Sequence, residues 1–217
     1  MKINHKIIGH KAPKKIALLL HGYGANYKDM LSISEEILDS SKIISENILF
    51  ICPNAPFEFE HTDYPTGRQW FSLTSRENWF VEKGLHTANE MITPYIQNIL
   101  NEYSLPYKDL FLSGFSQGAM LALYSGIRIN EKISGIISFS GTLLGKETIQ
   151  NDAKNIQDLC LIHGSVDEVL PCSYSKIAHK IMLDINWNSS LHIINNLPHS
   201  INEECIKIAT KFIEKRI

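Results

Sequence analysis

The chain has 217 residues, 44% of them hydrophobic, and its 21 lysines and arginines nearly balance its 23 aspartates and glutamates. A chain of this length can bury a sizeable core, so we expect one domain over residues 1–217. Because charges of both signs are interspersed, the sequence shows no basic face, which excludes nucleic acid as an expected partner.

The first apolar segment of the chain is too short to be a signal sequence or a membrane span. It covers residues 16–20, and Pro13, Lys14 and Lys15 precede it. A signal peptide needs a longer apolar core, and a spanning helix needs about 20 apolar residues. We therefore expect a cytoplasmic protein with no stable membrane insertion.

The spacing of cysteine and histidine indicates neither a disulfide framework nor a metal site. The four cysteines are far apart and form no Cys-x-x-Cys pair, which is typical of reduced thiols. No two of the nine histidines stand two or four residues apart. We expect no metal and no cofactor.

Strand-like and helix-like segments alternate along the chain. Apolar runs predict strands at residues 16–20, 48–52, 109–112, 133–139, 159–162 and 191–194. Helical spacing predicts helices at residues 29–39, 84–103, 173–185 and 201–217. Ser200 and Glu203 have the spacing of a capping box at the start of the last helix.

This alternation predicts an α/β fold with a mostly parallel central sheet and helices on both faces. In such sheets the functional groups gather at the carboxyl ends of the strands. Residues 53–83 show no clear period and look like an excursion over the surface. Ordinary connections are shorter, so we expect this segment to have a function.

The stretch Gly-Phe-Ser-Gln-Gly, residues 114–118, joins a predicted strand to an apolar helix. In a nucleophile elbow the serine occupies a sharp, strained turn, and the residues two positions away on either side are small so that strand and helix can approach closely. An ordinary strand-to-helix turn is the alternative, since Gly and Ser are common in loops. The elbow interpretation makes Ser116 the candidate nucleophile.

Two later loops supply candidate partners for Ser116. Asp167 follows the predicted strand 159–162, and His199 follows the predicted strand 191–194. Taken singly, each is an ordinary loop residue. Their order along the chain is that of an α/β hydrolase, and all three residues follow strand ends that meet at one edge of the sheet. Together they predict a catalytic triad.

Six stretches of the chain carry a resemblance to a known family. They are LLLHGYGAN, ICPNAPFEFE, GRQWFSL, GFSQGAMLAL, HGSVDEVLP and NLPHSIN. The chain resembles the carboxylesterase/phospholipase family of small α/β hydrolases, which also includes acyl-protein thioesterases. The resemblance implies an α/β-hydrolase fold without a large cap domain, cleavage of carboxylic esters or thioesters through an acyl-enzyme, and a two-fold homodimer. The stretch GRQWFSL is more similar to bacterial members than to eukaryotic thioesterases.

The oxyanion formed during acyl transfer needs backbone donors fixed in advance. The N–H of Gln117 is one candidate, because it begins a helix whose dipole favours negative charge. The loop His-Gly-Tyr-Gly, residues 21–24, is the second candidate, and the resemblance implies the N–H of Tyr23; a purely structural turn is the alternative. We interpret His21 and His163, which both precede a glycine at a strand end, as structural histidines.

Three carboxylates compete for the role of the catalytic acid. Asp184 lies near the end of a predicted helix, away from the strand ends. Glu168 is adjacent to Asp167 in sequence and should point another way. Asp167 directly follows a strand, in a segment that resembles the acid-bearing HGxxDxxxP pattern of the family, and we assign the acid to Asp167.

Apolar residues in two segments are candidates for an acyl pocket, namely Trp70, Phe71, Leu73, Leu143 and Leu144. Aromatic residues in a long loop also anchor such loops to the core. An apolar wall favours short to medium acyl chains.

The sequence thus predicts a serine carboxylesterase acting on a small-molecule or lipid-like acyl ester. An acyl-protein thioesterase or lysophospholipase is the alternative, and a lysophospholipase should expose an apolar patch beside its site. A non-catalytic binding module on the same fold is a third possibility.

Overall fold

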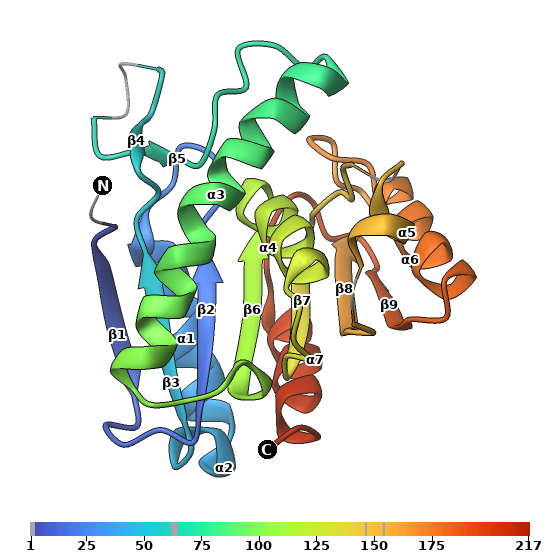
Figure 1. Cartoon of the computed structure of the whole chain (residues 1–217). Coiled ribbons are helices and arrows are strands. Elements are labelled where there is room, and N and C mark those ends of the chain that lie inside the picture. The colour runs from blue at the N-terminus through green and yellow to red at the C-terminus, as the bar shows by residue number, and fades with distance from the viewer. Residues whose placement is uncertain (1–2, 62–64, 146, 154) are drawn as a thin grey trace.

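Figure 1 shows the computed structural model, which describes residues 3–61, 65–145, 147–153 and 155–217. Its centre is a seven-stranded sheet of order β1-β3-β2-β6-β7-β8-β9. The strands are β1 (His5–Gly9), β2 (Lys15–Leu20), β3 (Ile48–Pro53), β6 (Leu110–Phe115), β7 (Gly135–Phe139), β8 (Asp158–Gly164) and β9 (Asn188–Ile194). Only β1 is antiparallel to its neighbour, so the predicted mostly parallel sheet is confirmed.

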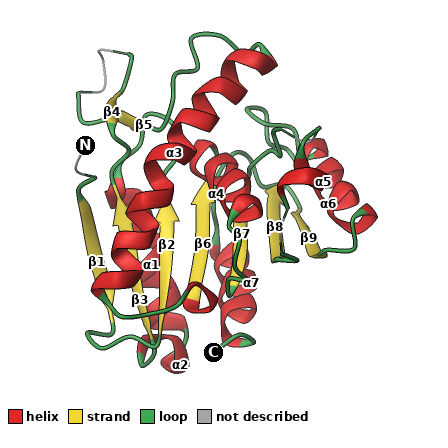
Figure 2. Ribbon diagram, in the orientation of Figure 1, coloured by secondary structure: helices red, strands yellow, loops and turns green. Residues whose placement is uncertain are grey.

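Helices cover both faces of this sheet (Figure 2). One face carries α1 (Tyr27–Ser40), α2 (Lys42–Ser45) and α7 (Glu203–Glu214). The other carries α3 (Asn78–Glu102), α4 (Gln117–Arg128), α5 (Ile149–Asp152) and α6 (Ser173–Asp184). Along β2 the side chains alternate between the two apolar layers: Leu18 packs in one, and Ala17 and Leu19 pack in the other. Both faces of a parallel sheet are therefore buried, which explains the unbroken apolar strands.

Three expectations about secondary structure need correction. The strand β1 was not predicted, because its residues at the sheet edge are largely exposed and form no apolar run. Helix α3 begins at Asn78, six residues before the expected start at residue 84. The sequence did not predict this first turn because its large apolar residue Trp79 is exposed, which breaks the helical spacing of buried apolar residues. The last helix is capped by Asn202, whose side chain accepts a hydrogen bond from the N–H of Cys205 at 3.1 Å; Ser200 is not its cap.

The segment between β3 and α3 is the predicted excursion. It contains the short antiparallel pair β4 (Phe57–Glu58) and β5 (Arg68–Gln69). Residues 62–64 of this segment lie outside the described residues. Within the described chain, no large cap domain covers the sheet, and no helix is long and apolar enough to cross a membrane.

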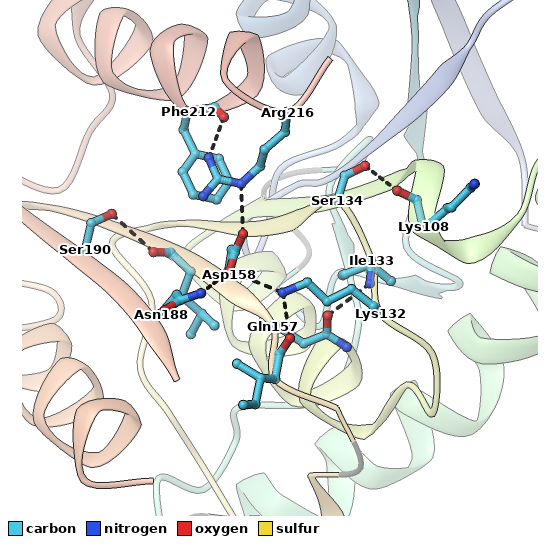
Figure 3. Close-up of polar contacts among 12 residues, drawn as sticks. Lys108, Lys132, Ile133, Ser134, Gln157, Asp158, Asn188, Ser190, Phe212 and Arg216 are labelled. Carbon is cyan, nitrogen blue, oxygen red and sulfur yellow. Dashed lines mark hydrogen bonds and ion pairs between the residues drawn. The ribbon is translucent and has the colours of Figure 1, made fainter. Parts of the chain in front are cut away.

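The amino ends of the last two strands are fastened by a polar cluster (Figure 3). The carboxylate of Asp158 at the start of β8 accepts from Asn188 at 2.8 Å, and from Lys132 and Arg216 at 3.3 Å each. These contacts join β8 to β9, to the loop before β7 and to the chain after α7. The cluster lies at the end of the sheet opposite to the loops that carry the predicted triad.

Candidate active site

Ser116 occupies a strained turn between β6 and α4. Its backbone has φ 52° and ψ −114°, a conformation that residues other than glycine rarely adopt. The Ser116 N–H donates to the carbonyl of Phe139 at 2.9 Å, and its own carbonyl accepts from the N–H of Met120 at 3.0 Å. The neighbouring strand and the first turn of α4 thus hold the strained residue in place.

The two glycines that bracket Ser116 are sterically required. A Cβ atom on Gly118 would lie 2.1 Å from the carbonyl oxygen of Leu20, and one on Gly114 would lie 2.4 Å from the backbone of Gly118. Neither contact is compatible with a methyl group. The glycines let α4 pass against β2 and β6 closely enough to form the turn, as the elbow interpretation requires.

Asp167 and His199 meet at the carboxyl ends of β8 and β9. The Nδ1 atom of His199 lies 2.6 Å from Oδ2 of Asp167, whose side chain is fully buried. The other oxygen, Oδ1, accepts from the N–H groups of Val169 at 3.0 Å and Leu170 at 2.8 Å. Burial raises the pKa of Asp167, but the hydrogen bonds from His199 and Leu170 outweigh it, and the net pKa is lowered. Asp167 is therefore an ionised carboxylate aimed at the imidazole.

A second imidazole contacts the same carboxylate. His163 is buried, and its Nε2 lies 2.7 Å from the carbonyl of Leu170 and 3.2 Å from Oδ2 of Asp167. Its Nδ1 lies 2.7 Å from the hydroxyl of Ser175. Burial lowers the pKa of His163, so the ring is neutral, with its proton on Nε2 facing two acceptors. The sequence analysis missed this contact with the acid, although the separation of four residues within HGSVD was a usable signal.

The competing carboxylates do not reach His199. Glu168 is exposed beside Asp167, and Asp184 is exposed at the end of α6. Of the three candidates, the structure brings only Asp167 into contact with the imidazole.

The candidate oxyanion loop after β2 is fixed by a buried histidine. Nδ1 of His21 donates to the carbonyl of Gly22 at 2.7 Å, and Nε2 accepts from the N–H of Ala55 at 2.9 Å. Burial lowers the pKa of His21 to about 4, so the ring is neutral near pH 7. This neutral ring anchors the loop that carries Tyr23.

Trp70 and Phe71 bind the excursion to the elbow. The side-chain oxygen of Gln117 accepts from the N–H of Trp70 at 2.9 Å, and its side-chain nitrogen donates to the carbonyl of Phe71 at 2.8 Å. The indole N–H of Trp70 donates to the carbonyl of His21 at 2.9 Å. Both aromatic side chains are buried in the core. They anchor the excursion, which was the alternative to a pocket role.

A cavity of about 620 Å³ opens over the elbow. It is lined by Ser116 and His199, by both candidate oxyanion residues Tyr23 and Gln117, and by Leu73 and Leu144. Trp70, Phe71 and Leu143 belong to the core and do not line it. Further apolar lining residues that sequence reasoning did not select are Val81, Phe115, Met120, Val169, Leu170 and Pro171.

The sequence pattern of the phospholipase/carboxylesterase family matches residues 3–217, which includes every residue of the site described above. The chain belongs to this family. This confirms the resemblance inferred from the six stretches of sequence. The protein is therefore a hydrolase of the esterase or thioesterase type.

Individual relatives of this family member support the assignment. Acyl-protein thioesterase 1 homologs 1 and 2 of Dictyostelium discoideum are 28% and 30% identical, over 99% and 91% of this chain and 95% and 90% of theirs. Among solved structures, esterase PE8 superposes with a TM-score of 0.92 at 29% identity, covering 100% of both chains. The Bacillus cereus carboxylesterase, at 17% identity and a TM-score of 0.77, covering 99% of this chain and 95% of its own, shares the fold.

The cysteines of this family member lie outside the candidate site. All four are free, and burial raises the pKa of Cys52 and Cys160 to about 11, which makes them poor nucleophiles. Among the described residues, no group of three or more His, Cys, Asp or Glu side chains could hold a metal. That the reaction needs no cofactor stays a prediction.

Proposed function

We propose that the protein is a serine carboxylesterase that cleaves carboxylic esters of short to medium acyl chains through an acyl-enzyme. The observation that carries the proposal is that the strained Ser116 lines one cavity with His199, whose imidazole contacts the buried carboxylate of Asp167. The three residues come from loops after three different strands, and only the folded sheet brings them together.

In the proposed mechanism, Oγ of Ser116 attacks the acyl carbonyl carbon while Nε2 of His199 takes the hydroxyl proton. Asp167 accepts from Nδ1 of His199, which leaves Nε2 as the nitrogen that serves as the base. The tetrahedral intermediate collapses as His199 returns the proton to the leaving alcohol. Water, activated by His199, then attacks the acyl-enzyme and releases the acid and free Ser116.

The charge on the carbonyl oxygen is assigned to two backbone donors, the N–H groups of Gln117 and Tyr23. Gln117 is the first residue of α4, where the helix dipole favours negative charge. Tyr23 lies in the loop after β2, and both residues line the cavity with Ser116.

We assign the acyl chain to the apolar part of the cavity, with Leu73 and Leu144 as part of its wall. Val81 and Met120 add apolar surface to the same wall, and both are otherwise packed in the core. A cavity of this kind binds an uncharged acyl chain in preference to a charged group.

The alternative is a thioesterase or lysophospholipase acting on lipid-like substrates. The named relatives that are acyl-protein thioesterases support it, and so does exposed apolar surface at the cavity. Val169 and Tyr174 line the cavity and are 58% and 43% exposed. A non-catalytic role would leave the assembled Asp167, His199 and Ser116 without a use. A two-fold homodimer and a cytoplasmic location complete the proposal, and sedimentation at high concentration tests the first.

The proposal is tested by chemical labelling and by a substrate panel. A fluorophosphonate should label Ser116 and no other serine, and labelling that survives Ser116→Ala would refute the elbow assignment. Oxygen esters and thioesters graded in acyl length should show hydrolysis of short to medium oxygen esters. Activity restricted to long-chain lysolipids would replace the carboxylesterase proposal with the alternative.

A further inference from the structure

The excursion between β3 and α3 braces the loop that carries Tyr23. The N–H of Gly24 donates to the carbonyl of Arg68 at 3.0 Å, and the N–H of Arg68 donates to the carbonyl of Ala25 at 2.8 Å. The guanidinium of Arg68 in turn donates to the carbonyl of Ala55 at 2.9 Å and to that of Pro56 at 2.5 Å. The loop after β2 therefore has a hydrogen-bonded partner strand in β5.

The carboxylate of Glu60 is the centre of this bracing. Its Oε1 accepts from the hydroxyl of Tyr23 and from the N–H of Leu73 at 3.0 Å. Its Oε2 accepts from the hydroxyl of Ser72 at 2.6 Å and from the side-chain amide of Gln69 at 3.1 Å. One half-buried carboxylate thus collects four donors from the oxyanion loop, β5 and the chain leading to α3.

The ring of Tyr23 is also fixed by packing. It lies edge-on against Phe59, with the ring centroids 4.7 Å apart. Phe59 itself covers Gly24, which has φ +76° and where a Cβ atom would lie 2.9 Å from the Phe59 ring. Since Glu60 accepts from the hydroxyl and Phe59 packs against the ring, two residues of the excursion hold the Tyr23 side chain and so restrict the Tyr23 backbone.

We propose that Glu60 is a positioning residue that couples the acyl-pocket wall at Leu73 to the oxyanion donor at Tyr23. The proposal rests on the proposed function above. Its basis is that a single oxygen atom, Oε1, accepts from both residues, while Leu73 and Tyr23 both line the cavity. An acyl chain that packs on Leu73 thereby holds the oxyanion loop in its active geometry, so acyl binding raises turnover as well as affinity.

A carboxylate suits this position because it accepts from all four partners at once. A glutamine in place of Glu60 would direct its amide nitrogen, a donor, at either the N–H of Leu73 or the side-chain nitrogen of Gln69, neither of which can accept, and an aspartate would be one methylene too short. Burial raises the pKa of Glu60, but hydrogen bonds from Ser72, Leu73 and Gln69 outweigh it and lower the pKa, so the group is ionised throughout the neutral range.

The test compares Glu60→Gln with the matched control Glu58→Gln, whose side chain is exposed on β4. Steady-state kinetics are measured with acetate and medium-chain esters of the same alcohol, and thermal melting is followed in parallel. For Glu60→Gln we expect kcat on the medium-chain ester to fall about tenfold or more while KM changes less than about threefold. The ratio of kcat between medium-chain ester and acetate should fall toward one. Glu58→Gln should retain the wild-type values.

Tyr23→Phe provides a second variant that keeps the ring packing and removes only the bond to Glu60. It should lower kcat in the same way, and the double variant should be no worse than Glu60→Gln alone, because Glu60→Gln already disturbs the bond between Tyr23 and residue 60 that Tyr23→Phe removes. Wild-type kcat and chain-length dependence in a folded Glu60→Gln protein would overturn the coupling, and so would strictly additive losses. Labelling of Ser116 in the wild type separates that outcome from failure of the proposed function.

Discussion

The imidazole of His199 and the carboxylate of Asp167 are joined by a 2.6 Å contact across two neighbouring strand ends. Because the carboxylate fixes the proton on Nδ1, Asp167→Asn should lower kcat by about 10⁴, as the same change does in serine proteases. Glu168→Gln, which alters an exposed neighbour, should change kcat by less than about tenfold. Kinetics on a soluble ester, with circular dichroism to verify folding, measure both; a crippled Glu168→Gln enzyme would mean that the acid is misassigned.

The steric requirement at the elbow predicts a severe effect of one methyl group. Gly118→Ala should shift Ser116 and lower the rate of fluorophosphonate labelling by about 10² or more, because its Cβ meets the carbonyl of Leu20. Ser125→Ala is the control in the same helix: it removes a buried hydroxyl for which the described structure shows no hydrogen-bond partner. If Gly118→Ala labels at the wild-type rate, the close approach of α4 to β2 is not what shapes the nucleophile.

The contact between His163 and Asp167 predicts that the second imidazole supports the acid. His163→Leu removes a donor from Oδ2 of Asp167 and should lower kcat on a simple ester by about tenfold, because the carboxylate is then held only by His199 and by the N–H groups of Val169 and Leu170. His163→Gln keeps an N–H and should restore most of kcat. Steady-state kinetics, with circular dichroism to verify folding, measure both variants; wild-type kcat in His163→Leu would mean that the contact does not support the acid.

Buried neutral histidines predict a stability change in mild acid. The pKa of His21 is lowered from 6.5 to about 4, so between these values the unfolded chain binds a proton that the folded protein does not. Stability is therefore complete above pH 6.5 and falls as the pH drops toward 4, by about 3 kcal/mol from this residue.

Urea unfolding at several pH values measures this dependence, and a single transition is expected for the proposed single domain. His21→Gln should be less stable at pH 7, and its free energy of unfolding should depend less steeply on pH. Burial also lowers the pKa of His163 and of His192, so these two histidines account for the pH dependence that remains. An unchanged slope in His21→Gln would contradict the assignment.

The sequence by itself determined the fold class and the order of the candidate triad. Both depend on local patterns: apolar strands alternate with amphipathic helices, and Ser116, Asp167 and His199 each follow a strand. Parallel strands carry their carboxyl ends to one edge, so residues after different strands converge whatever the detailed packing is. The role of the glycines around Ser116 could also be predicted from the sequence, because the elbow is a local turn.

Only the tertiary structure decided what the long excursion does and what surrounds the acid. Trp70 and Leu73 stand three residues apart in a segment without a period, yet one is buried beneath the elbow and the other lines the cavity. The proposed role of Glu60 rests on its contact with Tyr23, and that of His163 rests on its contact with Asp167. Such contacts depend on how irregular segments pack on the finished sheet, where hydrogen bonds between distant residues replace the periodic patterns that a sequence displays.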